Sequence, residues 1–500
     1  MKLATKEFLN EIDNLAASRI AEIRSTADNA VITGVKYYVS NDGDDQNDGL
    51  SPESAWKSLK KVTEAELNCG DGVLFRRGDV FRGGINTRDG VTYCAYGEGE
   101  KPRIYASERD LADPTLWELY DAEHNIWRLT FPMADCGTLV FNDGEYHSEK
   151  LIPSYRNGGF VCRNDVSRPF VLSEQMERDL DLFCECVAIM TEAPSKGENF
   201  PIPSVTPDNK GSLFLRCDRG NPGEVFHSIE ALVKRRIFNL NDNAGVHIDN
   251  LCIKYTGDHA IGGWSKLDDL HVTNCEIGWI GGSIQHYAGT DPNFPQDPRG
   301  AVTRYGNGIE VYGGCDDYLV DNCYIYQVYD AGVTHQITTN GKKYEMKRVR
   351  YVNNVIENCV YSIEYFIEKT GGDTESYMDD VVISGNILRL SGYGWGQQRH
   401  NFYTPAHIKG WSYENTASNY RIENNIFDRA AYRMVHIVAK EESSMPVMKG
   451  NTYVQKLGNS LGQFGANAVS EPENAVFDEN ADKKIAQTFG ENDAAVYYLK

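Results

Sequence analysis

The segment HAIGGWSKLDDLHVTNCEI (259–277) aligns without a gap on the segment NGIEVYGGCDDYLVDNCYI (307–325). Each contains short runs of strand-forming residues, separated by the Gly, Asn and Asp residues that are typical of turns. Units this short cannot bury a hydrophobic core alone, so each must pack against its neighbours. The two segments therefore predict a protein that is built by stacking repeats.

An Asn followed by apolar residues marks the same unit along the second half of the chain. It occurs at Asn250, Asn274, Asn322, Asn354, Asn386, Asn425 and Asn451. The separations of 24, 48, 32, 32, 39 and 26 residues fit one basic period with loop insertions. A leucine-rich repeat would need more Leu, and a propeller would need longer blades. We therefore predict an all-β fold, a right-handed parallel β-helix, in which these Asn side chains form one ladder at a turn.

The rest of the chain divides around this solenoid. Apolar residues at helical spacing within residues 5–25 predict an amphipathic helix, and the ends of a solenoid need covering. The predicted divisions are an N-terminal capping helix (1–30), first β-helix rungs (31–106), an inserted β-rich subdomain (107–236), the main β-helix with the candidate site (237–453) and a C-terminal cap (454–500).

Charge and cysteine content narrow the classes of function. The chain has 50 Lys and Arg residues against 72 Asp and Glu residues, a formal net charge of −22. Nucleic acids and anionic membranes need a basic footprint, so we exclude both as partners. The 12 Cys residues lack paired spacing, so we expect reduced, mostly buried thiols without disulfides or a zinc site. Phosphate-binding glycine loops and Gly-x-Ser-x-Gly elbows are absent.

The first residues, MKLATKEFLNEIDNLAASRI, contain acids throughout and lack the apolar stretch of a signal peptide. No run of about 18 apolar residues occurs anywhere, so we expect no membrane span. These features favour a cytoplasmic location.

Three segments near the start resemble the opening of many pectate-lyase-like β-helix proteins: YYVSNDGDDQNDGLSPESAWKSL (37–59), GDGVLFRRGDVFRGGI (70–85) and YGEGEKPRI (96–104). That superfamily includes polysaccharide lyases, epimerases and glycoside hydrolases, so the resemblance implies a fold and not one chemistry. The β-rich insertion, rejoined at SLFLRCDRGNPGE (212–224), is similar in layout to family 120 β-xylosidases. The resemblance implies a retaining hydrolase with an Asp nucleophile and a Glu acid/base, but no motif fixes their positions.

Four strands are expected to stack on one face: HAIGG (259–263), NGIEVYG (307–313), AGVTHQ (331–336) and SIEYF (362–366). If one aliphatic residue of each strand points inward, the residue after it points outward. The inward set is Ile261, Ile309, Val333 and Ile363, and the outward set is Gly262, Glu310, Thr334 and Glu364.

Two glutamates and one aspartate would gather on this outer face. Glu310 and Glu364 stand two rungs apart, about 9–10 Å at a strand spacing near 4.8 Å, and Asp330 lies about 5–6 Å from each. Such spacing lets one carboxylate attack an anomeric carbon while another protonates the leaving oxygen. We predict Glu364 as acid/base, Asp330 as nucleophile, and Glu310 as a hydroxyl binder or alternative catalyst. A solvated acidic face is the alternative interpretation in so acidic a chain.

Further residues near this face are predicted to bind substrate. They are Tyr312, His335, Gln336, Tyr365, Trp395, His407, Lys409, Trp411 and His436. Aromatic rings suit the C–H face of a pyranose, and His, Gln and Lys suit its hydroxyls. The Pro-rich insertion at 287–305 is expected to wall a binding cleft.

Acids are present and bases scarce on the central strands, which favours hydrolysis. We expect an exo-acting, retaining glycoside hydrolase on short neutral or weakly charged oligosaccharides, in an oligomeric state that the sequence leaves open. One alternative is a polysaccharide lyase or sugar epimerase, with a base among His407, Lys409, Arg399 and His400. Another is a non-catalytic carbohydrate-binding β-helix. No cofactor or metal is expected, with Ca²⁺ as the alternative, because the loop NDGDDQNDG (41–49) has suitable oxygens but reads as a polar turn.

Overall fold

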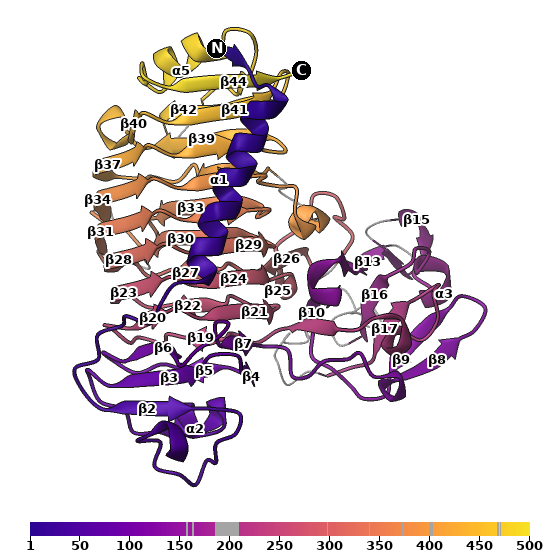
Figure 1. Ribbon diagram of the computed structural model, residues 1–500. Coiled ribbons are helices and arrows are strands. Elements are labelled where there is room, and N and C mark those ends of the chain that lie inside the picture. Colours follow the sequence, from indigo (N-terminus) through magenta and orange to yellow (C-terminus); the bar gives the residue numbers. More distant parts are fainter. Residues whose placement is uncertain are drawn as a thin grey trace.

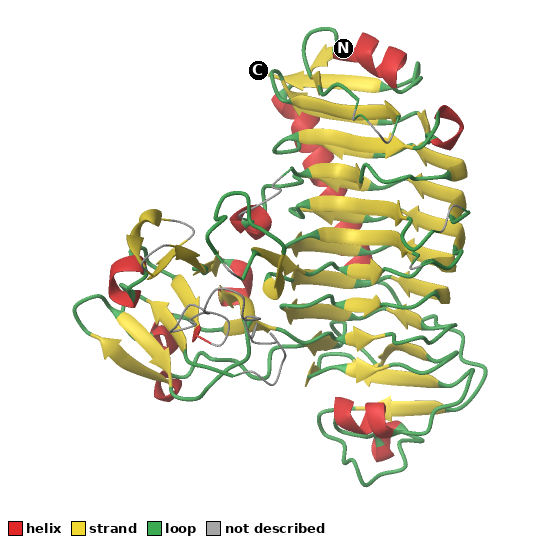
Figure 2. Ribbon diagram, turned by 180° about the vertical axis from the view of Figure 1, so that it is seen from behind, coloured by secondary structure: helices red, strands yellow, loops and turns green. Residues whose placement is uncertain are grey.

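The computed structural model describes residues 1–156, 159–162, 165–185, 210–297, 299–339, 341–372, 375–399, 404–467, 470 and 472–500. The chain forms a right-handed parallel β-helix, as the repeat predicted, and a β-rich insertion projects from its side (Figures 1 and 2). Three long sheets, named A, B and C here, form the walls, and successive rungs are parallel neighbours within each sheet.

The sheets have the following strands among the described residues. Sheet C contains β5 (Ile85–Asn86), β19 (Phe238–Asn239), β22 (Ile261–Gly263), β27 (Ile309–Val311), β30 (Ala331–Thr338), β33 (Tyr361–Glu368), β36 (Ala406–Gly410), β39 (Arg433–Ala439), β42 (Ser460–Ala466) and β43 (Ala475–Val476). Sheet B contains β2 (Lys36–Val39), β3 (Gly72–Arg76), β6 (Thr92–Tyr96), β20 (His247–Asp249), β23 (Leu267–Thr273), β28 (Cys315–Asp321), β31 (Glu345–Val352), β34 (Tyr377–Ser384), β37 (Ala417–Glu423) and β40 (Val447–Lys449). Sheet A contains β1 (Lys2–Leu3), β4 (Val80–Arg82), β7 (Arg103–Tyr105), β10 (Cys136–Phe141), β11 (Tyr146–His147), β18 (Ile229–Val233), β21 (Cys252–Thr256), β24 (Glu276–Ile280), β29 (Tyr324–Val328), β32 (Val355–Glu357), β35 (Ile387–Arg389), β38 (Ile426–Asp428), β41 (Thr452–Lys456) and β44 (Ala495–Leu499).

The core consists of side chains that point into the solenoid and stack from rung to rung. On sheet C the stacked register partners are fully buried, and they are Ile261, Ile309, Val333 and Ile363. Burying one such aliphatic side chain contributes roughly 1.5–3 kcal/mol. The predicted aliphatic stack is confirmed, and it fixes which residues of these strands point outward.

A buried ladder of amides follows one turn of the solenoid. Asn354 donates to Asn386, Asn386 to Asn425, and Asn425 to Asn451, with N···O distances of 3.0, 2.9 and 3.1 Å. Glu491 accepts the last amide proton from Asn451. Backbone N–H groups donate to the same amide oxygens, so the ladder connects each turn to the next.

The predicted ladder was wrong in its alignment, because two adjacent turn positions were treated as one. One position has a left-handed backbone, which Asn tolerates better than most residues; it includes Asn250, Asn274 and Asn322, with φ values of 62°, 55° and 52°. Ile325 pairs with Ile356. Asn354 therefore aligns with Cys323, one position after Asn322. The Cys323 thiol donates to a backbone carbonyl where later rungs use an amide.

The N-terminal helix α1 (Lys6–Arg24) is confirmed, but its predicted place over an end of the solenoid is not. It runs along the outside of sheet A, across several rungs (Figure 1). Ala16 and Ile23 pack there against Tyr324, Val355 and Ile387. The ends of the stack carry α2 (Leu59–Glu64) and α5 (Ala481–Thr488) instead. No helix in the described part of the chain combines the length and apolar character that a bilayer span requires.

Two predicted boundaries move. The insertion contains one sheet of β8 (Trp117–Asp121), β9 (Ile126–Leu129), β12 (Glu149–Lys150), β16 (Asp181–Cys184) and β17 (Leu213–Arg216), and another of β13 (Pro153–Arg156), β14 (Gly159–Cys162) and β15 (Asp165–Pro169), with short helices α3 (Leu172–Gln175) and α4 (Pro222–Val225). Strand β18 pairs with β21 of sheet A, so the insertion ends before the predicted residue 236. Strands β41 and β42 continue sheets A and C, so the cap begins after them and not at residue 454.

Replacing Asn386 with Ala should break the amide ladder in its middle. The backbone N–H and side-chain amide of Asn354 would lose their shared acceptor, and each buried donor left unpaired costs about 1–3 kcal/mol. We expect the free energy of unfolding to fall by about 2–4 kcal/mol, measured from urea denaturation.

Asn424→Gly is the matched control for this variant. Asn424 is exposed and has a φ of 56°, a conformation that Gly adopts freely. Its replacement should change the free energy of unfolding by no more than about 0.5 kcal/mol. Equal losses in the two variants would contradict a specific role for the ladder.

Candidate active site

Strand register brings the predicted acids to one outer face of sheet C. Glu310 pairs with Gly262 on the preceding rung, and Glu364 pairs with Thr334. Because β27 pairs with β30 and β30 with β33, the two glutamates stand two rungs apart on the same face. Asp330 directly precedes β30, on the rung between them.

These acids line a cavity of about 300 Å³, which is at the small end of ligand pockets. Six residues that the sequence predicted line it: Glu310, Tyr312, Asp330, Gln336, Glu364 and Trp411. Eight more described residues complete the lining: His259, Trp264, Gln285, His286, Tyr305, Asn307, Phe366 and Tyr413. The hairpin β25 (Ser283–Ala288) and β26 (Ala301–Tyr305) carries three of them. Of the predicted insertion 287–305, Tyr305 lines the cavity, and the other two hairpin residues, Gln285 and His286, lie just before it.

Glu364 is a buried residue of this cavity lining. Trp411 Nε1 donates to one carboxylate oxygen, and Gln336 Nε2 donates to the other at 2.9 Å. Burial, and then the negative charge of Asp330, raise the pKa of Glu364 to about 8. Glu364 is therefore protonated at neutral pH and can donate a proton to a bound molecule.

Asp330 is held in a different electrostatic environment. The Arg399 guanidinium forms an ion pair with its carboxylate, and Arg399 itself lies against the Tyr361 ring at 5.8 Å. The pair places a positive charge directly beside Asp330, whereas at Glu364 the lowering effect of Arg399 on the pKa is smaller than the raising effects of burial and of Asp330. Two neighbouring carboxyl groups with opposed environments are the arrangement that separates an acid from a nucleophile.

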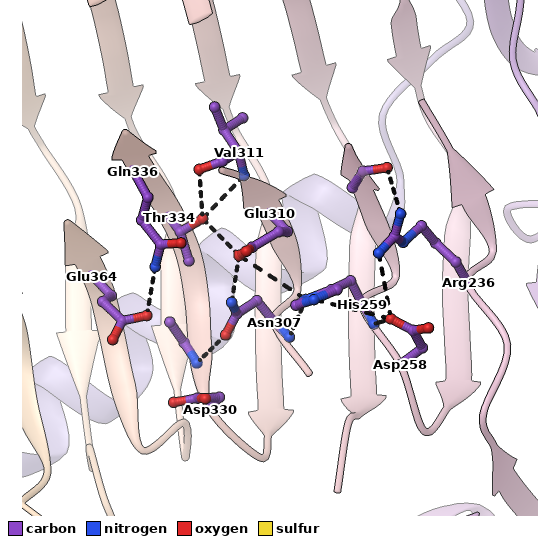
Figure 3. A network of polar contacts seen from close by, with 12 residues as sticks. Arg236, Asp258, His259, Asn307, Glu310, Val311, Asp330, Thr334, Gln336 and Glu364 are labelled. Atoms are coloured by element: carbon purple, nitrogen blue, oxygen red, sulfur yellow. Dashed lines mark hydrogen bonds and ion pairs between the residues drawn. The ribbon is translucent and has the colours of Figure 1, made fainter. Parts of the chain in front are cut away.

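Glu310 is the centre of a hydrogen-bond network that Figure 3 shows. Asn307 Nδ2 and Thr334 Oγ1 both donate to Glu310 Oε2, the latter at 2.9 Å. Asn307 Oδ1 in turn accepts the backbone N–H of Ala331 at 2.8 Å. Asn307 therefore fixes the position of Glu310 relative to the turn that carries Asp330.

His259 presents a ring nitrogen without a hydrogen bond to the described residues beside this network. It is fully buried in the wall, and its Nδ1 accepts the backbone N–H of Asn307 at 3.0 Å. Burial lowers the pKa of His259, so the ring is neutral and its proton is on Nε2. That Nε2 has no hydrogen-bond partner among the described residues, and the nearest carboxylate oxygen, Asp258 Oδ1, is 4.0 Å away. A buried donor in a cavity wall is available to a ligand oxygen.

Two predicted binding residues point into the core. His335 and Tyr365 are register partners with stacked rings 5.0 Å apart, and His335 Nε2 lies 3.0 Å from Tyr420 Oη. Burial lowers the pKa of His335 to about 3. Each follows an outward-facing residue directly, so the alternation of a strand turns it inward. The prediction that they contact substrate was wrong.

Trp395 and His407 are also core residues and not substrate contacts. The Trp395 ring packs at 5.1 Å from Tyr329, and its Nε1 donates to the Gln327 carbonyl. His407 Nδ1 lies 2.8 Å from Ser391 Oγ, and burial lowers the pKa of the ring to about 3. Neither residue lines the cavity.

Lys409 and His436 share the outer face but lie behind the cavity wall. They continue the column of Glu364 as its register partners on the next two rungs. Lys409 Nζ lies 3.0 Å from His436 Nδ1 and 4.1 Å from the centre of the Trp411 ring. Their predicted orientation is confirmed, whereas their predicted contact with substrate is not, because the Trp411 side chain is the group that lines the cavity.

Several lining residues were missed by sequence reasoning. Phe366 lies two residues after Glu364, so strand alternation alone could have placed it on this face. His259 aligns with Asn307 in the two segments that define the repeat. Trp264 and the hairpin residues gave no periodic signal, because they come from turns and from a segment that folds back on the solenoid.

The structure also bears on the polar loop 41–49 and on the candidate bases of the lyase alternative. In the loop 41–49, Asp45 accepts both N–H groups of Lys57 and Ser58, and Asp48 accepts the N–H of Leu50. These contacts match a polar turn. Of the proposed lyase bases, Arg399 is paired with Asp330, and His400 is outside the described residues.

The titration of Glu364 can be measured without a substrate. Infrared spectra should show a protonated carboxyl band that disappears as the pH rises through about 8 and that is missing in Glu364→Gln. The Trp411 hydrogen bond lowers this pKa and the Asp330 charge raises it. Trp411→Phe should therefore shift the transition to higher pH, and Asp330→Asn to lower pH. Shifts in the opposite directions, or a band that persists in Glu364→Gln, would refute the assignment.

Comparisons with known proteins were made with both sequence and structure. Neither the models of known protein families nor the curated proteins gave a match. A structure described as XylC in complex with xylose is 11% identical, with 93% of this chain and 83% of that chain covered and a TM-score of 0.45. A GH136 lacto-N-biosidase from Eubacterium ramulus is 12% identical, with 99% and 71% covered and a TM-score of 0.35. A structure described as a glycoside hydrolase is 8% identical, with 93% and 96% covered and a TM-score of 0.41. At TM-scores below 0.5 these likenesses carry no argument for function, which rests on the side chains of the cavity.

Proposed function

We propose that the protein is a glycoside hydrolase that uses Glu364 as its general acid and Asp330 as its nucleophile. The observation that carries the proposal is the raised pKa of Glu364, about 8, beside the ion-paired carboxylate of Asp330 in one small cavity. Hydrolysis of a glycosidic bond needs such a pair, with one carboxyl group protonated and one charged.

The reaction would proceed in two steps, each of which inverts the configuration of the anomeric carbon. Asp330 attacks the anomeric carbon while Glu364 transfers its proton to the departing glycosidic oxygen, which gives a covalent glycosyl–enzyme. Glu364, now a carboxylate, takes a proton from water, and the water oxygen displaces Asp330. Asp330 and Glu364 come from neighbouring rungs and line the same cavity, and the charge of Asp330 raises the pKa of Glu364. This arrangement supports the assignment of a retaining mechanism, in which the two carboxyl groups act from about 5–5.5 Å apart.

The lining supports a short, uncharged sugar as the substrate. Trp264 and Tyr312 pack edge to face at 5.3 Å, and Trp264 is 53% exposed, which makes it the available stacking platform. His259 Nε2, which makes no hydrogen bond to the described residues, suits a sugar hydroxyl. Among the described residues of the lining there is no Lys or Arg to match a uronate carboxylate. A cavity this small favours removal of single terminal units.

The first experiment is an incubation with short plant and host-glycan oligosaccharides, read in two ways. We expect new reducing ends without the ultraviolet absorbance of an unsaturated sugar. NMR of the first product formed should show the anomeric configuration of the substrate. Absorbance from a double bond would mean β-elimination and would refute hydrolysis. A product with inverted anomeric configuration would exclude the covalent glycosyl–enzyme intermediate.

Removing either carboxylate should stop the chemistry without unfolding the protein. We expect Glu364→Gln and Asp330→Asn each to lower kcat by at least about a thousandfold, or roughly 4 kcal/mol of barrier. Azide should rescue Asp330→Asn by attacking the sugar in its place. Full activity in Asp330→Asn, with loss in Glu310→Gln, would transfer the nucleophile role to Glu310.

Two controls separate catalysis from folding. Glu357→Gln changes a part-buried glutamate of sheet A that accepts from Tyr324 Oη at 2.6 Å, and it should keep its activity. The raised pKa of Glu364 means that its contribution to stability falls as the pH rises from about 4.5 to about 8. Glu364→Gln should therefore be at least as stable as the parent protein at pH 8, measured by thermal unfolding.

A further inference from the structure

A column of left-handed residues runs down the outside of sheet B, one on each of the five successive strands β23, β28, β31, β34 and β37. Its members are Asp269, Asp317, Arg348, Asp380 and Asn419, with φ values between 51° and 59°. Two of its acids have guanidinium partners. Asp317 is bonded by Arg348, and Asp380 by Arg350. This pairing compensates the negative charge along the column.

Asp269, the first acid of this column, has two imidazoles in place of a guanidinium. Its Oδ1 lies 3.3 Å from His247 Nε2 and 3.2 Å from His271 Nε2. His247 and His271 are register partners on β20 and β23. Their rings are stacked with centres 4.3 Å apart and planes 9° apart. Both ring nitrogens are therefore presented to the same carboxylate oxygen.

The three atoms have the spacing of ligands around a small cation. All lie within 4.8 Å of one another. In a tetrahedral zinc site with bonds of about 2.0–2.1 Å, neighbouring ligand atoms are about 3.3–3.4 Å apart. The two N···O distances match that edge. Imidazole with carboxylate is also the donor set that Zn²⁺ and related divalent ions prefer.

We propose that His247, Asp269 and His271 bind one divalent transition-metal ion of the zinc type. The side chains are 36%, 50% and 34% exposed, so the fourth position faces solvent and would be filled by water. The ion would connect β20 to β23 and replace the guanidinium that later rungs provide. The site lies on sheet B, away from the sheet C cavity, so the proposal is independent of the proposed hydrolase activity.

Metal binding can be tested on the full-length protein after dialysis against a chelator. Calorimetric titration with Zn²⁺ should give one saturable site, and Zn²⁺ should raise the unfolding temperature. Co²⁺ should give the visible spectrum of nitrogen and oxygen ligation, without the charge-transfer band of a thiolate. That spectrum excludes binding at the exposed Cys69.

His247→Ala and His271→Ala should each weaken Zn²⁺ binding by at least about tenfold. The matched control is His124→Ala. His124 is also 36% exposed and lies 2.9 Å from one carboxylate, that of Asp121, so its loss should leave the affinity unchanged. The proposal is wrong if the parent protein shows no saturable site, or if both histidine variants bind Zn²⁺ as the parent does.

Discussion

The register between neighbouring parallel strands of sheet C is the constraint on which the site depends. Because side chains alternate along a strand, a slip of one residue would exchange the inner and outer sets. The buried stack through Ile309 and Ile363 prevents that slip. Glu310 and Glu364 are outward because their neighbours are committed to the core, so the packing of the solenoid determines the geometry of the carboxyl groups.

Burial then gives the chemical character that alignment alone would not. An acid on an open sheet face would titrate near its ordinary value, but Glu364 is buried, and Trp411 donates to it in the cavity that the hairpin also lines. The Arg399 guanidinium forms an ion pair with Asp330, and its smaller effect on Glu364 does not cancel the raised pKa. The difference between two carboxyl groups one rung apart therefore comes from irregular segments that are added to a regular scaffold.

The sequence predicted what is local or periodic. The repeat predicted the solenoid, and alternation placed Glu310 and Glu364 on one face. Alternation also argued against placing the His335 and Tyr365 side chains on that face, because the residues just before them, Thr334 and Glu364, were already assigned to it. Features without a period could not be predicted in this way. Trp395 lies in an irregular turn. Strand β10 joins sheet A through antiparallel pairing with β18, a partner far along the chain. The predicted Asn ladder was misaligned by one position because Asn occurs at two adjacent turn positions. At one it adopts a left-handed backbone, and at the next its buried side chain donates to the Asn of the following rung.

The position of α1 has a consequence for the order in which the protein is assembled on the ribosome. Its apolar face packs on Val355 and Ile387, and Ile12 packs near Val454. The strand before it, β1, pairs with β44, the last strand of sheet A. The residues of β1 and α1 are therefore synthesised long before the rungs that they contact. Until then the helix must remain an unpacked amphipathic segment, and its docking completes folding as a strap that joins successive rungs.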